Sequence, residues 1–273
     1  MNRSDTYNGR IRWTTNRTTP CAGLDIPVAE GLEIQTRDDA GLDQSLAGIR
    51  PNSPRSIALK SLAWPFTRPL EEFFGHQWLQ HQLGRWLRRY ATDQTCFLEC
   101  GPGDMSFRRF LPRGAAYNTI EFAVSEFQIH RVVKKDPRVN FCIASITDIP
   151  VADNTCDIVA CIEMLQQIIP ADKAMSEIRR VAKPGAKLLC TIGNGKCDKV
   201  ERKGKNRVYA HFWSDAEFQA IAARAGFKML EHYQTGRWIR VPKWITERPL
   251  HLPITSGNEY YNSYFVYLFE IEK

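Results

Sequence analysis

The feature that most restricts the fold of this chain is an alternation of apolar and amphipathic segments that begins near residue 95. Short apolar runs predict strands, and segments whose apolar residues recur at helical spacing predict helices. The predicted strands cover residues 96–99, 117–121, 139–144, 157–161, 187–192 and 227–231, and the predicted helices cover 171–183 and 214–225. Because a parallel strand is reached through a crossover, this order predicts a mostly parallel sheet with helices on its faces.

The last predicted strand indicates its own place in that sheet. In residues 263–271 both faces are apolar, with Phe265 and Phe269 on one face and Val266 and Leu268 on the other. Such a strand is covered on both sides, so we expect it inside the sheet and not at an exposed edge.

The turn after the first strand carries the clearest functional signal. Glu99 ends the strand, and Gly101 and Gly103 form a G-x-G turn that we expect to lead into a helix. In a doubly wound sheet this turn lies where ligands bind, and glycine lets the backbone approach a ligand closely. A dinucleotide site would need a third glycine where this chain has Ser106, and the Glu99 carboxylate would repel a pyrophosphate. The carboxylate instead favours a cationic ligand with an ammonium group, so the turn predicts S-adenosylmethionine (SAM) rather than NAD.

A second acid, Glu121, ends the second predicted strand, 20 residues beyond Gly101. A carboxylate at this place accepts hydrogen bonds from ribose hydroxyls. Two carboxylates separated by the glycine turn and one crossover therefore predict a site for a positively charged nucleoside.

The first 94 residues differ from the alternating part. Residues 1–55 are polar and charged and keep no helical or strand period, so they are predicted to form a tail that is mobile or laid over the domain. Residues 56–94 are predicted to form a helical extension, because apolar residues lie on one face of a helix over 69–90. Such a helix packs on the domain, or serves as a lid or a membrane-surface helix.

Charge and cysteine content bear on partners and compartment. The net charge is +7, and residues 195–250 hold 12 basic and 6 acidic side chains, which fits an ordinary solvated surface or an anionic partner. The eight cysteines form no CxxC pair and have no histidine at zinc spacing, so we expect free thiols, no metal site and a cytoplasmic protein. Neither a secretory signal nor a transmembrane segment is expected, because the first twenty residues are polar and no run approaches about 18 apolar residues.

Four further motifs follow in order. Residues 144–150 resemble a Gly-Asp-x-x-x-Leu-Pro loop, 153–159 an Asp-x-Ser-Phe-Asp-x-Val strand start, 177–186 a Glu-x-x-Arg-Val-Leu-Lys-Pro-Gly-Gly signature, and 225–227 an Ala-Gly-Phe turn. Together with the glycine turn, they resemble the class I SAM-dependent methyltransferases, in the type 11 group related to ubiquinone-biosynthesis methyltransferases. The motifs cover about half of the chain.

The resemblance implies an α/β, three-layer Rossmann-like fold. Its seven-stranded sheet would carry the last strand antiparallel beside the fifth, in a methyltransferase domain over 95–273 with cap insertions near 194–213 and 234–262. Four aromatic residues of the second insertion would line the acceptor pocket or pack in the core, namely Trp238, Trp244, Tyr260 and Tyr261.

The resemblance also implies SAM as the cofactor and assigns the residues that would contact it. These are Glu99, Cys100, Gly101, Pro102, Gly103, Glu121, Phe122, Ser145, Ile146 and Cys161. Two positions depart from the family: Met105 replaces the third glycine of its G-x-G-x-G turn, and Ser145 replaces the acid that meets the adenine amine. A hydroxyl accepts that hydrogen bond more weakly than a carboxylate, and Asp148 is a nearby substitute.

Residues at the same sheet edge are candidates to face the methyl acceptor. Glu163 and Gln167 follow the fourth strand, and Tyr209, His211 and Trp213 follow the fifth. His211 is the natural general base, because histidine titrates near neutral pH, and Glu163 is the second catalytic candidate. The segment after the fourth strand has no Asn-Pro-Pro-Tyr-like motif, which argues against methylation of an exocyclic amine of DNA or RNA.

The sequence thus predicts an enzyme that transfers a methyl group from SAM by in-line displacement to a small-molecule or carrier-linked acceptor. The acceptor atom, which is oxygen, nitrogen or carbon, and the oligomeric state stay open. The alternatives are an RNA or protein methyltransferase that uses the basic 195–250 segment, and a binding protein of the same fold that has lost transfer.

Overall fold

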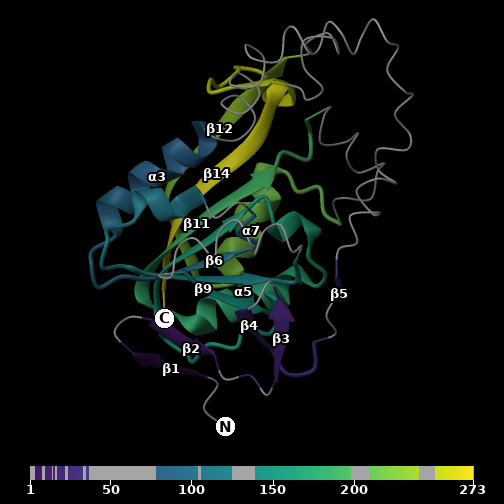
Figure 1. Ribbon diagram of the computed structural model, residues 1–273. Coiled ribbons are helices and arrows are strands. Elements are labelled where there is room, and N and C mark those ends of the chain that lie inside the picture. Colours follow the sequence, from purple (N-terminus) through teal and green to yellow (C-terminus); the bar gives the residue numbers. More distant parts are fainter. Residues whose placement is uncertain are drawn as a thin grey trace, which may run out of the picture.

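The computed structural model shows a twisted sheet with helices on both faces (Figure 1). It describes residues 4–7, 10–13, 15, 17–21, 24–32, 35–36, 78–103, 106–124, 139–197, 210–239 and 250–272.

Within these residues, ten strands form the main sheet in the spatial order β13, β12, β14, β11, β10, β6, β7, β9, β4, β3. Their bounds are β3 (Arg17–Cys21), β4 (Leu24–Val28), β6 (Cys96–Cys100), β7 (Ala116–Glu121), β9 (Val139–Ile143), β10 (Cys156–Ile162), β11 (Ala182–Gly193), β12 (Phe227–Ile239), β13 (Leu250–Leu252) and β14 (Asn262–Ile271). Two smaller pairs are β1 (Ser4–Tyr7) with β2 (Arg10–Trp13), and β5 (Gln35–Thr36) with β8 (Ala123–Val124). The helices are α3 (Trp78–Tyr90), α5 (Ala171–Val181), α7 (Asp215–Arg224) and the 3-10 turns η2 (Ser106–Phe110), η4 (Leu165–Gln167) and η5 (Glu259–Tyr261).

The seven middle strands confirm the predicted fold. Strands β9, β7, β6, β10 and β11 are parallel to one another, and β14 lies between β11 and β12, antiparallel to both. Its register places Leu268 opposite Leu189 of β11 and Glu231 of β12. Every β14 residue except Glu270 is buried, as the apolar character of both faces requires.

The sheet separates two hydrophobic clusters. In β6, Leu98 and Cys100 contribute to one cluster and Phe97 to the other, because successive side chains of a strand point to opposite faces. Helices α5 and α7 cover the first face, and α3 with η2 covers the second. The result is the predicted three-layer arrangement.

Helix α3 is the described part of the helix predicted over 69–90, since residues 69–77 lie outside the described ranges. Its apolar face is buried against the sheet through Trp78, Leu79, Leu83, Trp86 and Leu87. Two polar contacts tie it to β12: the Trp86 indole donates to Glu231 at 3.0 Å, and the Tyr233 hydroxyl donates to Gln82 at 3.0 Å. These contacts favour the packing role over a lid or a membrane-surface helix. Among the described residues, the structure contains no helix with the length and apolar character needed to cross a membrane.

Part of the amino-terminal region forms strands, although its sequence shows no strand period. Strands β3 and β4 form an antiparallel pair that extends the sheet beyond β9, where the Ala29 amide donates to the Ile143 carbonyl at 2.9 Å. In β2, Ile11 is buried and its amide donates to Asn118 at 3.0 Å. Of the two alternatives predicted for residues 1–55, these strands therefore fit a segment laid over the domain and not a mobile tail. The sequence gives little indication of β4, because only Ile26 and Val28 are buried and two alternating apolar residues do not establish a strand pattern.

The predicted cap insertions are partly described. The second one contributes the end of β12, which runs eight residues further than predicted, together with β13 and η5. Tyr260 and Tyr261 are 57% and 47% exposed on η5, so they are not core residues. Residues 198–209 and 240–249, with Tyr209 and Trp244, lie outside the described ranges, as does the side chain of Trp238.

Candidate active site

Five parallel strands end at one edge of the sheet, and this edge gathers the predicted cofactor residues. The register pairs Cys100 at the end of β6 with Ile120 of β7 and Cys161 of β10. Glu121 follows Ile120 and lies opposite Ile143 of β9. The topology thus brings together, at neighbouring strand ends, residues that the sequence places 20 to 60 positions apart.

The glycine turn has the backbone geometry that only glycine adopts without strain. Gly101 and Gly103 have φ angles of +69° and +54°, and the Gly101 amide donates to the Ile120 carbonyl at 2.9 Å. A Cβ at Gly101 would lie 2.9 Å from the sulfur of Met164, whereas a Cβ at Gly103 would meet no described atom within 4 Å. The turn therefore forms a backbone cradle that is open above Gly103, as a ligand-binding turn requires.

The segment after the turn differs from the predicted helix. Its described part is the five-residue 3-10 turn η2, and Asp104 and Met105 lie outside the described ranges. The effect of the Met105 departure on the turn thus lies outside what the structure describes.

Glu99 places a carboxylate beneath the turn. The residue is 3% exposed, and the Tyr117 hydroxyl of β7 donates a hydrogen bond to its carboxylate. Tyr117 is itself buried in the cluster on the α3 side of the sheet. The Glu99 carboxylate is therefore buried and held by Tyr117, two residues before Gly101 of the turn.

Glu121 and Phe122 form the adjoining side of the edge. Glu121 is half-buried, and its carboxylate accepts a hydrogen bond from the Phe122 amide at 3.0 Å. The Phe122 ring is 41% exposed. A carboxylate and an exposed aromatic ring at consecutive positions suit the ribose and the base of a nucleoside.

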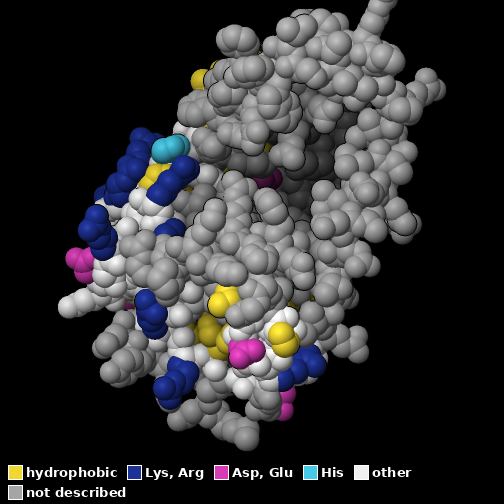
Figure 2. All heavy atoms as spheres, viewed as in Figure 1, with side chains coloured by type: hydrophobic (Ala, Val, Ile, Leu, Met, Phe, Trp, Pro, Cys, Tyr) yellow, Lys and Arg dark blue, Asp and Glu magenta, His cyan; other side chains and the backbone are white. Residues whose placement is uncertain are grey.

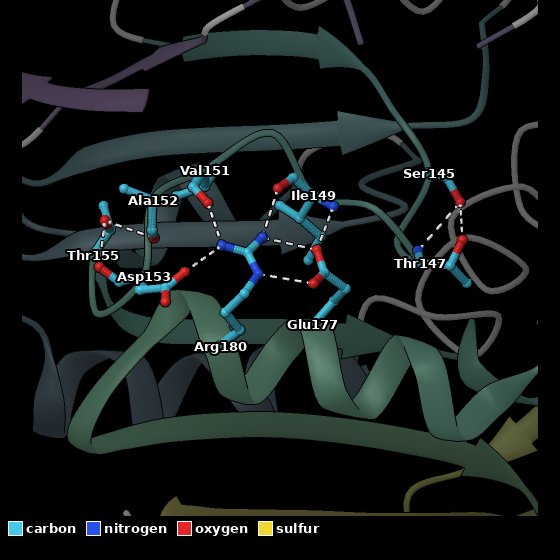
Figure 3. Close-up of polar contacts among 9 residues, drawn as sticks. All are labelled: Ser145, Thr147, Ile149, Val151, Ala152, Asp153, Thr155, Glu177 and Arg180. Atoms are coloured by element: carbon cyan, nitrogen blue, oxygen red, sulfur yellow. Dashed lines mark hydrogen bonds and ion pairs between the residues drawn. The ribbon is translucent and has the colours of Figure 1, made fainter. Parts of the chain in front are cut away.

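The loop after β9 continues this side of the site. The hydroxyls of Ser145 and Thr147 lie 2.7 Å apart, and the Thr147 amide donates to the Ser145 hydroxyl at 3.2 Å (Figure 3). Ile146 is buried between them, and Asp148 is exposed. Ser145 thus organises the loop locally where the family has an acid.

Arg180 of α5 holds the far end of the same loop. Its guanidinium donates to the carbonyls of Ile149 and Val151 at 2.8 and 2.7 Å (Figure 3). It also forms two 2.8 Å bonds with Glu177, whose carboxylate accepts the Ile149 amide at 2.8 Å. The Glu-x-x-Arg part of the predicted signature is therefore a clamp between helix and loop.

Two adjacent glutamines after β10 lie in different environments. Gln167 is exposed and its amide donates to the Glu163 carbonyl at 2.8 Å, which closes the turn around the positive φ of Glu163, 52°. Gln166 is 1% exposed, and among the described residues neither polar atom of its amide has a hydrogen-bond partner. No sequence pattern distinguishes the two neighbours, so the burial of Gln166 is not predictable from the sequence.

His211 lies close to this segment, but its ring is engaged. Its amide donates to the Gln166 carbonyl at 3.0 Å, and its Nε2 lies 2.9 Å from the Ile168 carbonyl oxygen. Because a carbonyl only accepts, Nε2 carries the proton in this contact. The ring also stacks on Trp213, with centroids 4.5 Å apart and 8° between planes. These contacts give His211 and Trp213 a structural role in the loop and oppose a base function at Nε2.

The strands that form this edge lie in a region that matches a known protein family. A family model described as a methyltransferase domain matches residues 98–190, which begin in β6 and end in β11. Residues 98–190 thus resemble a methyltransferase domain, in agreement with the resemblance to the type 11 group seen in the sequence.

The chain also resembles individual proteins over part of its length and of theirs. It is 34% identical over 97 residues to the uncharacterized protein MJ0638 of Methanocaldococcus jannaschii, covering 36% of this chain and 40% of that protein. It is 29% identical over 110 residues to the uncharacterized methyltransferase C1B3.06c of Schizosaccharomyces pombe, covering 36% and 39%. The matched region thus spans about two fifths of these curated relatives.

A solved structure supports the fold more widely. A chain from the complex between the Haloferax volcanii Trm112 methyltransferase activator and a methyltransferase superimposes with a TM-score of 0.56. It is 14% identical, and the superposition covers 77% of this chain and 95% of that one. At this identity the likeness concerns the fold alone.

Two buried thiols lie at the carboxyl ends of β6 and β10. Cys100 and Cys161 are buried and face each other across β6 and β10. The neighbouring Cys161 thiol, and then burial, raise the pKa of Cys100 well above its usual value. A neutral buried thiol is a packing group, so Cys100 and Cys161 shape the floor of the site.

Proposed function

We propose that this protein is an enzyme that transfers a methyl group from SAM to an acceptor bound at the carboxyl edge of the sheet. The observation that carries the proposal is the glycine turn with positive φ at Gly101 and Gly103, which follows Glu99 and bonds to the strand that ends at Glu121, within residues that match a methyltransferase domain. Because the matched region covers only part of the curated relatives, the activity of the whole protein belongs to the proposal.

The residues of the cradle fit the chemical groups of SAM. Glu99 supplies negative charge for the ammonium group, and the turn at Gly101 and Gly103 admits the amino-acid part. Glu121 would accept hydrogen bonds from the ribose, and the loop at Ser145 and Ile146 would border the adenine. When bound, SAM supplies a methyl group already activated by its sulfonium.

The protein's own contribution is alignment of the acceptor. Residues at this edge would hold the acceptor atom in line with the methyl group, with S-adenosylhomocysteine as the leaving group, and any proton that the acceptor loses would pass to Glu163 or to solvent. Because Nε2 of His211 is engaged with Ile168, we assign His211 to loop positioning, and Glu163 is the remaining proton acceptor among the two candidates.

We propose a small-molecule or carrier-linked acceptor in the cytoplasm, where the buried free thiols of the described chain would stay reduced. Gln167 and Trp213 are the described candidates to face this acceptor, and Tyr209 is a further candidate. Incubation of cell extracts with methyl-labelled SAM, read by mass shift, identifies the acceptor class. Label on a small molecule or on a carrier-bound group supports the proposal, and label confined to RNA or to amino-acid side chains of proteins contradicts it.

Isothermal titration with SAM tests cofactor binding. We expect saturable binding by the wild type and at least tenfold weaker binding by Glu121→Gln, about 1.4 kcal/mol or more. The exposed Glu272 provides the matched control, since Glu272→Gln should bind like the wild type. Absence of wild-type binding up to millimolar SAM would overturn the proposal.

A further inference from the structure

A surface of arginines covers the solvent side of α3 and the adjoining η2, apart from the proposed methyl-transfer site. Five of its six members are exposed and Arg108 is half-buried. The six are Arg85, Arg88, Arg89, Arg108, Arg109 and Arg113. Figure 2 shows Lys and Arg side chains gathered on the side of the molecule where α3 lies in Figure 1. We call this set the arginine surface.

Few acidic groups offset its charge. Glu231 pairs with Arg89 at 2.9 Å, and Asp93 accepts the Gly114 amide at 2.8 Å. Within the described part of the chain, Arg85, Arg88, Arg109 and Arg113 form no ion pair.

The positive field reaches the neighbouring histidine. Burial, and after it the charges of Arg109 and Arg88, lower the pKa of His81. Among the described residues, the arginine surface therefore carries an excess of positive charge.

Part of the arginine surface is held in place before any partner binds. The guanidinium carbons of Arg88 and Arg109 lie 5.0 and 4.8 Å from the centroid of the Phe110 ring, and Arg109 also donates to Gln80 at 3.2 Å. The His81 ring packs edge-on against Phe110, with centroids 5.3 Å apart. Such anchoring reduces the conformational entropy that binding would remove.

We infer that the arginine surface binds the phosphate backbone of a nucleic acid. Arginine presents a planar fork of donors that matches phosphate oxygens, and its weak hydration favours such contacts. The 13 residues of α3 extend about 20 Å, enough to follow several successive phosphates. This inference goes beyond the proposed methyl transfer. Because RNA binding is measured without SAM, RNA binding and methyl transfer can each fail independently of the other.

The composition of the surface distinguishes a nucleic acid from other anionic partners. A helix that lies on a membrane inserts its apolar face, but the apolar face of α3 is buried against the sheet. A protein interface is centred on aromatic and apolar anchors, and the aromatic member here, Phe110, is 4% exposed beneath the arginines. Charge without exposed apolar anchors is typical of backbone recognition.

Fluorescence anisotropy with a labelled RNA hairpin of about 20 nucleotides tests the inference in the full-length protein. We expect a Kd in the micromolar range at low salt. The four arginines that form no ion pair within the described residues predict a slope of log K against log salt of about −3. The triple variant R85Q/R88Q/R109Q should bind at least tenfold more weakly, with a slope of about −1.

A matched control lies on the opposite face of the sheet. Arg179 and Arg224 are exposed on α5 and α7, and R179Q/R224Q should bind RNA like the wild type. Circular dichroism verifies that each variant is folded. The variant R85K/R88K/R109K keeps the positive charges and should therefore bind RNA more tightly than R85Q/R88Q/R109Q. Unchanged binding by the triple variant, an equal loss in the control, or retention on phosphatidylserine vesicles without RNA binding would each overturn the inference.

Discussion

The substitution Arg180→Met tests how far the site depends on the clamp between α5 and the loop after β9. It removes five hydrogen bonds of 2.7–2.8 Å, which reach the Glu177 carboxylate, the Asp153 carboxylate and two loop carbonyls. Glu177 is 15% exposed, so the substitution leaves a largely buried carboxylate without its cation.

The magnitude follows from burial. Removal of one partner of a buried ion pair destabilises a protein by about 3–5 kcal/mol. The Arg180 side chain is 22% exposed, so we expect the low end, about 3 kcal/mol in the free energy of unfolding. For a domain of this size that corresponds to a fall in Tm of about 6–12 °C. SAM binding should weaken as well, because the clamped loop carries Ser145 and Ile146.

Urea denaturation followed by circular dichroism measures the effect. The neighbouring Arg179 is exposed and forms no ion pair among the described residues, so Arg179→Met should change stability by less than about 0.5 kcal/mol. Arg180→Lys keeps the charge but not the fork of donors, and should fall between the two. If Arg180→Met matches Arg179→Met, the clamp does not stabilise the loop and the reasoning fails.

Three further outcomes follow from the same structure. Gln166→Met should raise the free energy of unfolding by about 1 kcal/mol in denaturation experiments, because it removes an unsatisfied buried amide, and Gln167→Met should not. Ser214→Ala should lower stability by about 1 kcal/mol at pH 7, because Ser214 caps α7. Hydrogen bonds from Ser214 lower the pKa of Glu217, so this carboxylate stabilises the fold above its unfolded pKa and the benefit is lost as the pH falls through its folded pKa. The effect of Ser214→Ala should therefore shrink in acid, and an effect independent of pH would contradict the capping box. The seven described thiols are buried, so a thiol reagent should label them only after unfolding, and rapid labelling of Cys100 in the native protein would refute their assignment as packing groups.

The fold was largely predictable from local pattern. The helix predicted over 214–225 is present as α7, where Ser214 and Glu217 form a capping box, and the two-faced apolar strand lies inside the sheet. Both patterns reflect burial or hydrogen bonding that the sequence records directly. The added pair β3–β4 escaped prediction because two buried side chains are too few to establish a period.

The site was predictable where the backbone conformation restricts the residue type. It was less predictable where tertiary contacts determine whether a side chain is buried or hydrogen-bonded. The positive φ angles at Gly101 and Gly103 follow from the motif. The burial of Gln166 rather than Gln167 and the engagement of His211 with Ile168 depend on how the loop after β11 returns to η4. No local pattern carries that information.

A crystal structure of the protein with S-adenosylhomocysteine, the demethylated product of SAM, tests the central claim most directly. We expect the amino-acid part over the turn at Gly103, and the ribose hydroxyls within hydrogen-bonding distance of the Glu121 carboxylate. A nucleoside bound elsewhere, with the space above Gly103 filled by the protein's own side chains, would contradict the account.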